Sequence, residues 1–261
     1  MTTSFSQDQI SEWAYFSGDH NKVHFDEEIA KKNGLNGVIV QGMLVLQDAK
    51  KALTQYIGGP SRIKFYLKEP VYRDKEIIYL ISRKNDEYHL KVHDINGCCC
   101  ITGRASPEKG ETDIVQAKHN IAIDRPFLEK QIQLYQALYP EAGYSWMIMD
   151  ALLFSVCFKY QNGDPFYAKA QKITLEPDKS KVVTFQVDQD IFITEDILTY
   201  DCADLNDLTF YYEDQDVVKE DYSVYSLLNY QIYRRDKLLY QASMGSITRA
   251  FEAQNRAINK R

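Results

Sequence analysis

The sequence contains the same order of segments twice: an apolar helical segment, then a series of strand-like segments. Residues 42–57 are expected to form a helix whose first turns are apolar on nearly every face, and residues 146–158, WMIMDALLFSVCF, have the same character. Such a helix has to be covered on all sides, and a curved antiparallel sheet can wrap around it. The sequence therefore predicts an α+β protein of two helix-and-sheet halves.

The segments between these helices have the composition of strands. In the first half they lie at 62–67, 76–83, 87–93 and 98–105, and Asn96-Gly97 predicts a hairpin between the last two. In the second half they lie at 166–176, 181–188, 208–213, 222–233 and 238–250. Residues 106–120 are polar and contain Pro and Gly. We therefore expect a first domain at 1–105, a linker at 106–120 and a second domain at 121–261.

Capping signals place the shorter helices. Ser6 has a glutamine three residues on, the spacing of a capping box, and Gly18 is expected to end that helix. Asp26 can cap a second short helix. In the second half Pro126 is expected to open one helix and Ser145 to cap the next.

Composition excludes several classes of protein. The 37 acidic and 31 basic side chains give a formal charge of −6, which argues against nucleic acid as a partner. Five cysteines, three of them consecutive at 98–100, suit buried, reduced thiols better than disulfides or a metal site. The absence of a leader pattern and of a long apolar run predicts a cytoplasmic protein with no membrane partner.

The stretch FSGDHNKVHF, residues 16–25, carries an aspartate and two histidines between apolar segments. Taken alone it is compatible with a polar turn, since small polar side chains satisfy free backbone groups. It is also compatible with a catalytic pair, in which Asp19 accepts a proton from water while His24 orients that water. A metal site at His20 and His24 is disfavoured, because residues four apart converge on a helix and this segment contains loop formers.

A catalytic pair needs an electrophile nearby, and the start of the first apolar helix could hold one. Gly42 stands there, where free backbone N–H groups and the helix dipole stabilise a developing oxyanion. Glycine would also allow a ligand's carbonyl group to approach closely.

The string FSGDHNKVH, followed by Ala30 and by GVIVQGM, resembles the signature of the MaoC-like (R)-specific enoyl-CoA hydratase family. The similarity covers residues 5 to about 105 and includes EPVYRDKEI. It implies a hot dog fold, here a double one, and reversible hydration of trans-2-enoyl-CoA to (R)-3-hydroxyacyl-CoA as in fatty acid metabolism. By motif position, Asp19 and His24 would be the catalytic pair, Gly42 the amide that binds the thioester carbonyl, and Asn21 a loop-shaping residue at the substrate. Lys22 and Gln41 depart from the motif, which usually has proline and histidine there.

All five histidines lie at or before His119, so the second half cannot carry such a pair and is expected to be a degenerate hot dog. No cofactor or metal is expected beyond the CoA thioester, which is the substrate. The side chains expected to meet its phosphates are Arg62, Lys64, Lys68 and Arg73. A 3-hydroxyacyl-ACP dehydratase, a non-catalytic acyl-CoA-binding protein and a thioesterase are the alternatives, and a homodimer is compatible with all of them.

Overall fold

The computed structural model describes residues 1–108, 117–141, 143–160, 182–220 and 223–250. Its helices are α1 Gln7–Ser17, α2 Glu27–Lys32, α3 Gly42–Thr54, α4 Arg125–Leu138, α5 Ser145–Ser155 and α7 Glu195–Leu198, with a 3₁₀ turn η1 at Lys22–His24 and a π-helical turn η2 at Val156–Tyr160. Its strands are β1 Thr2–Thr3, β2 Ser61–Leu67, β3 Ile77–Lys84, β4 Glu87–Asp94, β5 Cys99–Pro107, β6 His119–Ile121, β7 Val182–Ile193, β8 Leu208–Glu220, β9 Ser223–Arg234 and β10 Lys237–Ala250.

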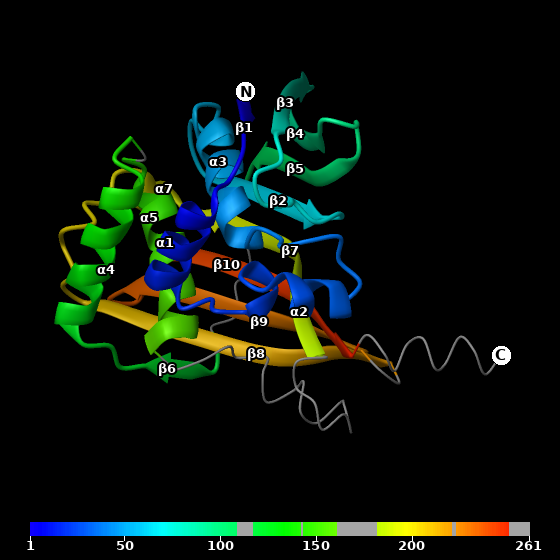
Figure 1. The fold of residues 1–261 in the computed structure, drawn as a ribbon. Helices are drawn as coiled ribbons and strands as arrows, with labels where there is room; N and C mark the ends of the chain where they lie inside the picture. The colour runs from blue at the N-terminus through cyan, green and yellow to red at the C-terminus, as the bar shows by residue number, and fades with distance from the viewer. Residues whose placement is uncertain (109–116, 142, 161–181, 221–222, 251–261) are drawn as a thin grey trace.

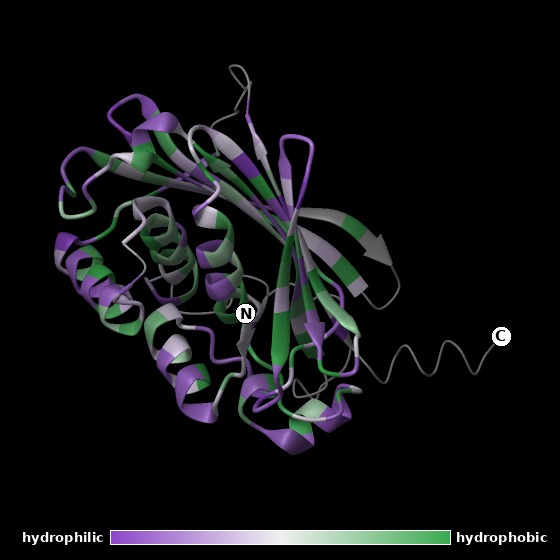
Figure 2. Cartoon of the chain, turned by 90° about the horizontal axis from the view of Figure 1, so that it is seen from above, coloured by the Kyte–Doolittle hydropathy of each residue, from purple (hydrophilic) through white to green (hydrophobic). Residues whose placement is uncertain are grey.

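The strands form one antiparallel sheet that runs through both halves of the chain. Within the described residues its order is β1-β3-β4-β5-β2-β7-β10-β9-β8-β6. The two halves meet where β2 pairs with β7, from Ser61 opposite Ile193 to Tyr66 opposite Asp188. The helices lie together on one side of this curved sheet (Figure 2). This is the predicted arrangement of two helix-and-sheet halves.

The two apolar helices are buried as expected. Leu46 on α3 and Met147 on α5 are both 0% exposed, and both belong to one hydrophobic cluster that also contains residues of β2, β7 and β10. The halves therefore share one core rather than packing as separate bodies. Residues 42–54 are helical and 55–56 form a turn, so the first of these helices ends three residues before the predicted position.

The predicted helix starts are mostly confirmed. Ser6 and Gln9 form a complete capping box on α1, and the Asp26 carboxylate caps α2 by accepting two backbone N–H groups. Proline stands at the first turn of α4. The prediction for Ser145 is wrong: this residue is the first of α5, and its hydroxyl donates to the carbonyl of Tyr200 at 2.5 Å instead of capping the helix.

The strand predictions agree with the sheet, except that 166–176 lies outside the described residues. All five cysteines are free thiols. Burial is confirmed for Cys100, Cys157 and Cys202, whereas Cys99 is only half-buried. The prediction is wrong for Cys98, which is exposed at the end of the β4–β5 turn. None of the helices in the described ranges has both the length and the apolar composition that a membrane span requires.

Candidate active site

The loop after α1 is fixed by Gly18, which has φ of +86° and donates its N–H to the carbonyl of Ala14 at 2.8 Å. A Cβ atom at this position would also lie 2.8 Å from the Cα of Lys159 on η2. Only glycine satisfies both constraints. The chain thus turns sharply at residue 18 and delivers the next side chain, Asp19, toward a pocket.

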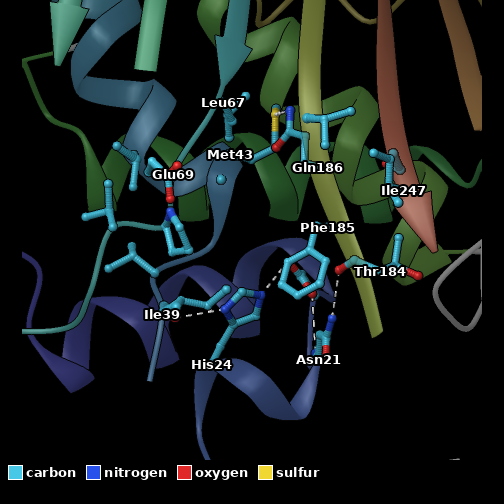
Figure 3. A pocket seen from close by; sticks show the side chains of 18 of the residues that line it. Asn21, His24, Ile39, Met43, Leu67, Glu69, Thr184, Phe185, Gln186 and Ile247 are labelled. Atoms are coloured by element: carbon cyan, nitrogen blue, oxygen red, sulfur yellow. Dashed lines mark hydrogen bonds and ion pairs between the residues drawn. The ribbon is translucent and has the colours of Figure 1, made fainter. Parts of the chain in front are cut away.

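Asp19 and His24 face each other in this pocket. The Asp19 Oδ2 atom lies 3.7 Å from His24 Nε2, and the two side chains are 18% and 8% exposed. His24 Nδ1 lies 2.9 Å from the carbonyl oxygen of Ile39, so in the neutral ring Nδ1 carries the hydrogen and Nε2 the lone pair (Figure 3). A separation of 3.7 Å exceeds a direct hydrogen bond and suits a water that both groups contact.

Asn21 shapes the loop between the two. Its Oδ1 atom accepts from the N–H of Val23 at 3.4 Å, and its Nδ2 donates to the carbonyl of Thr184 on β7 at 3.2 Å (Figure 3). Lys22 is exposed and begins η1. The loop of the first half is therefore held by a strand of the second.

Gly42 is the first residue of α3 and has no room for a side chain. A Cβ atom would lie 2.6 Å from Gln186 Oε1 and 2.7 Å from a methyl of Leu67. The N–H groups of Leu44 and Val45 donate to the carbonyl of Gln41, and those of Gly42 and Met43, which both line the pocket, precede these first bonds of the helix. Gln41, fully buried before them, donates from Nε2 to the carbonyl of Ile10 at 3.1 Å and so ties α3 to α1.

The pocket has a volume of about 490 Å³. Asp19, Asn21, His24, Gly42 and Lys68 all line it, so the structure brings these five sequence candidates together. The remaining wall comes from both halves and includes the largely apolar set Leu35, Ile39, Val40, Met43, Val45, Leu67, Ile101, Phe154, Phe158, Phe185, Met244 and Ile247. A polar end and an apolar remainder can accept an amphiphilic ligand such as an acyl thioester.

The other candidate cations lie elsewhere. Arg62 donates to Asp190 through Nε and Nη2 at 2.8 and 2.7 Å, and Lys64 lies 3.0 Å from the same carboxylate. Arg73 lies 3.1 Å from Glu27 and 3.5 Å from Asp74. Arg62, Lys64 and Arg73 are not among the residues that line the pocket. Their contact with phosphates stays a prediction.

No pattern in the sequence indicates that the second half contributes to the pocket. Thr184, Phe185 and Gln186 of β7 and Arg249 of β10 line the pocket beside the loop that carries Asp19 and His24. The composition of β7 and β10 predicts that they are strands and does not indicate that these residues line a pocket. Among the described residues, no group of three or more His, Cys, Asp or Glu side chains is arranged to hold a metal ion.

Comparison with known proteins places the first part of the chain in a family. The family model of the MaoC like domain matches residues 1–93, which contain the loop and all of α3. This part of the chain is a MaoC-like domain. A mitochondrial 3-hydroxyacyl-[acyl-carrier-protein] dehydratase of Arabidopsis thaliana is 33% identical over 83 residues, which make up 31% of this chain and 50% of that protein. The chain thus matches half the length of this curated relative.

Solved structures resemble most of the chain, as two examples show. One is a MaoC-like dehydratase, with a TM-score of 0.50, 12% identity and coverage of 94% of each chain. The other is a Mycobacterium tuberculosis protein described as a double hotdog fold, with a TM-score of 0.51, 9% identity and coverage of 95% of this chain and 94% of the other. At these identities the likeness concerns the fold, and the predicted double hot dog is confirmed. The boundaries at 105 and 120 stay predictions.

Proposed function

We propose that this protein catalyses the reversible hydration of a trans-2-enoyl thioester to the (R)-3-hydroxyacyl thioester. The observation that carries the proposal is the pair of Asp19 Oδ2 and His24 Nε2, 3.7 Å apart, in the same pocket as the first amides of α3 at Gly42. The pair can activate a water, and the amides can stabilise an enolate.

In the hydration direction, the water held by the pair attacks C3 of the enoyl group and gives one proton to Asp19. The electrons of the double bond move toward the thioester, and the oxygen of its carbonyl gains negative charge beside Gly42. The proton is then returned to C2, so that H and OH are added and both side chains end in their starting states. Because the same pair serves both carbons, the two additions occur on one face.

CoA is the carrier that we favour. The carrier proteins of acyl chains are acidic and would be attracted by a basic rim. The charged side chains lining the pocket are mixed in sign: Lys68 and Arg249 against Asp19 and Glu69. The match to an acyl-carrier-protein dehydratase keeps the ACP thioester as a second candidate.

The test follows the ultraviolet absorbance of the enoyl thioester when a short trans-2-enoyl-CoA is added. The wild type is expected to remove the absorbance, whereas Asp19→Asn and His24→Ala are expected to lose at least about 100-fold in kcat, the usual contribution of one acid or base. An (R)-specific 3-hydroxyacyl-CoA dehydrogenase added afterwards reports the configuration of the product.

His20→Ala is the matched control, because His20 is exposed, belongs to the same loop and does not line the pocket. It should retain activity. If the wild type binds acyl-CoA but leaves the absorbance unchanged at every chain length, the protein is an acyl-CoA-binding module. Activity with the ACP thioester alone would select the second candidate, and full activity in His24→Ala would remove this residue from the mechanism.

A further inference from the structure

Strand β7 contains a β-bulge beside the candidate active site. In its ladder with β10, Asp188 is opposite Gly245 and Gln186 is opposite Ser246, so Val187 has no opposite residue. A bulge adds one residue to one strand and reverses the alternation of side chains beyond it. Two residues three apart across Val187 can therefore point to the same face of the sheet.

Two glutamines do so. Gln189 points to the helices and donates from Nε2 to the buried carboxylate of Asp150 on α5 at 2.9 Å. Gln186 points to the same side and reaches α3, where its Nε2 donates to the sulfur of Met43 at 3.4 Å. In a regular strand, side chains three residues apart lie on opposite faces. The bulge is thus what turns Gln186 into the pocket.

The amide of Gln186 lies at the start of α3. Its Oε1 atom is 2.6 Å from where a Cβ of Gly42 would be, and Figure 3 shows the side chain between β7 and Met43, close to Leu67. Its donor, Nε2, is hydrogen-bonded to the thioether sulfur of Met43, which is a weak acceptor. A carbonyl oxygen is a stronger acceptor, and the terminal amide rotates about a soft torsion. The donor is therefore available to a ligand that brings a carbonyl group to Gly42.

We propose that Gln186 is a second donor to the thioester carbonyl, opposite the backbone amide of Gly42. On binding, the thioester oxygen lies beside the N–H of Gly42, and rotation of the Gln186 amide brings Nε2 to the side that Oε1 now occupies, from which it donates to that oxygen. The second half of the chain, which has no histidine after His119, then donates a hydrogen bond directly to the reacting group. This inference rests on the proposed function only in that the pocket receives an acyl thioester.

The experiment compares two ligands that differ in one carbonyl: butyryl-CoA and its thioether analogue S-butyl-CoA, which keeps the chain and the CoA. Dissociation constants are measured by calorimetry for the wild type and for Gln186→Met, which has a similar shape and no donor. The wild type should prefer the thioester, and Gln186→Met should lose about fivefold of this preference, the worth of one neutral hydrogen bond of about 1 kcal/mol. The preference for the thioester that remains in Gln186→Met is attributed to the backbone amide of Gly42.

Ile247→Val is the matched control, because Ile247 also lines the pocket and has no polar group to lose. It should shift both dissociation constants by the same factor. An unchanged preference in Gln186→Met would overturn the proposal, as would a wild type that binds both ligands equally or neither. A loss of preference in a protein that never hydrates enoyl-CoA would support the role of Gln186 and refute the hydratase function, so the two failures are distinguishable.

Discussion

Replacing Lys50 or Asp150 is expected to destabilise the protein more than other charge changes, because this ion pair joins the central helices of the two halves inside the core. Lys50 Nζ on α3 lies 2.5 Å from Asp150 Oδ2 on α5, and both side chains are 0% exposed. Breaking a buried pair by removing one partner leaves an uncompensated charge and costs about 3–5 kcal/mol.

The surroundings of the two charges predict an asymmetry. Asp150 Oδ1 also accepts from Gln189 Nε2 at 2.9 Å and from the hydroxyl of Tyr240 at 2.8 Å. Among the described residues, the other hydrogen-bond contact of the Lys50 ammonium is the Met43 sulfur at 4.0 Å. Lys50→Met should therefore cost about 3 kcal/mol and Asp150→Leu about 5 kcal/mol, the two ends of that range. The double variant should cost less than Asp150→Leu, because it leaves no buried charge.

The assay is urea unfolding at pH 7, with the free energy of unfolding taken from the midpoint and slope. Lys51→Met is the matched control: Lys51 is the next residue and pairs with Glu141 at 2.8 Å, but the two side chains are 43% and 81% exposed. Its cost should stay within about 1 kcal/mol. If the effects of Lys50→Met and Asp150→Leu simply add in the double variant, the reasoning from a buried pair is refuted.

The same pair predicts a pH dependence. Burial lowers the pKa of Lys50 from its ordinary value of 10.5, and Asp150 opposes the shift. In Asp150→Leu burial acts without this opposition, so the unfolded chain binds a proton that the folded chain does not. The free energy of unfolding of this variant should then rise with pH until the ordinary lysine pKa is passed. Urea unfolding at pH 7 and pH 10 would show this, and a fall relative to the wild type would contradict it.

Three further predictions concern the loop, the pocket wall and the thiols. Lys22→Pro should raise the free energy of unfolding by about 0.4–1 kcal/mol, because residue 22 opens a helical turn and Asn21 before it already has the extended conformation that precedes proline, with ψ of 125°; a lower melting temperature would refute this. Phe154→Leu should enlarge the pocket at its apolar wall and increase the affinity for octanoyl-CoA relative to butyryl-CoA in calorimetry. An unchanged ratio of the two dissociation constants would place the acyl chain elsewhere. Iodoacetamide at pH 8 should label exposed Cys98 before Cys157, whose pKa burial raises to about 12, and mass spectrometry showing equal rates would contradict the described burial.

Local signals along the chain predicted most of the elements. The capping box at Ser6, the cap at Asp26 and the Asn96-Gly97 turn depend on contacts within a few residues, and the structure contains all three. The grouping of Asp19, His24 and Gly42 could also be predicted from the sequence, because all three lie in one short loop and at the start of the apolar helix that follows.

The contribution of the second half could not be read in this way. Gln186 turns into the pocket because of a bulge at Val187, and a bulge depends on how β7 pairs with β10, more than fifty residues away along the chain. Arg62 and Lys64 looked like free cations, but β2 pairs with β7 and brings Asp190 to them. Ser145 looked like a cap, but its hydroxyl binds the carbonyl of Tyr200.

Local sequence patterns therefore predicted the helices, most of the strands and the loop that carries the candidate acid and base, because these follow from side-chain period, capping and turn geometry. The tertiary structure decided which strand of the second half closes the pocket, which charges are neutralised by partners and how Lys50 meets Asp150. These depend on pairing and burial between distant segments, and no local pattern records such contacts.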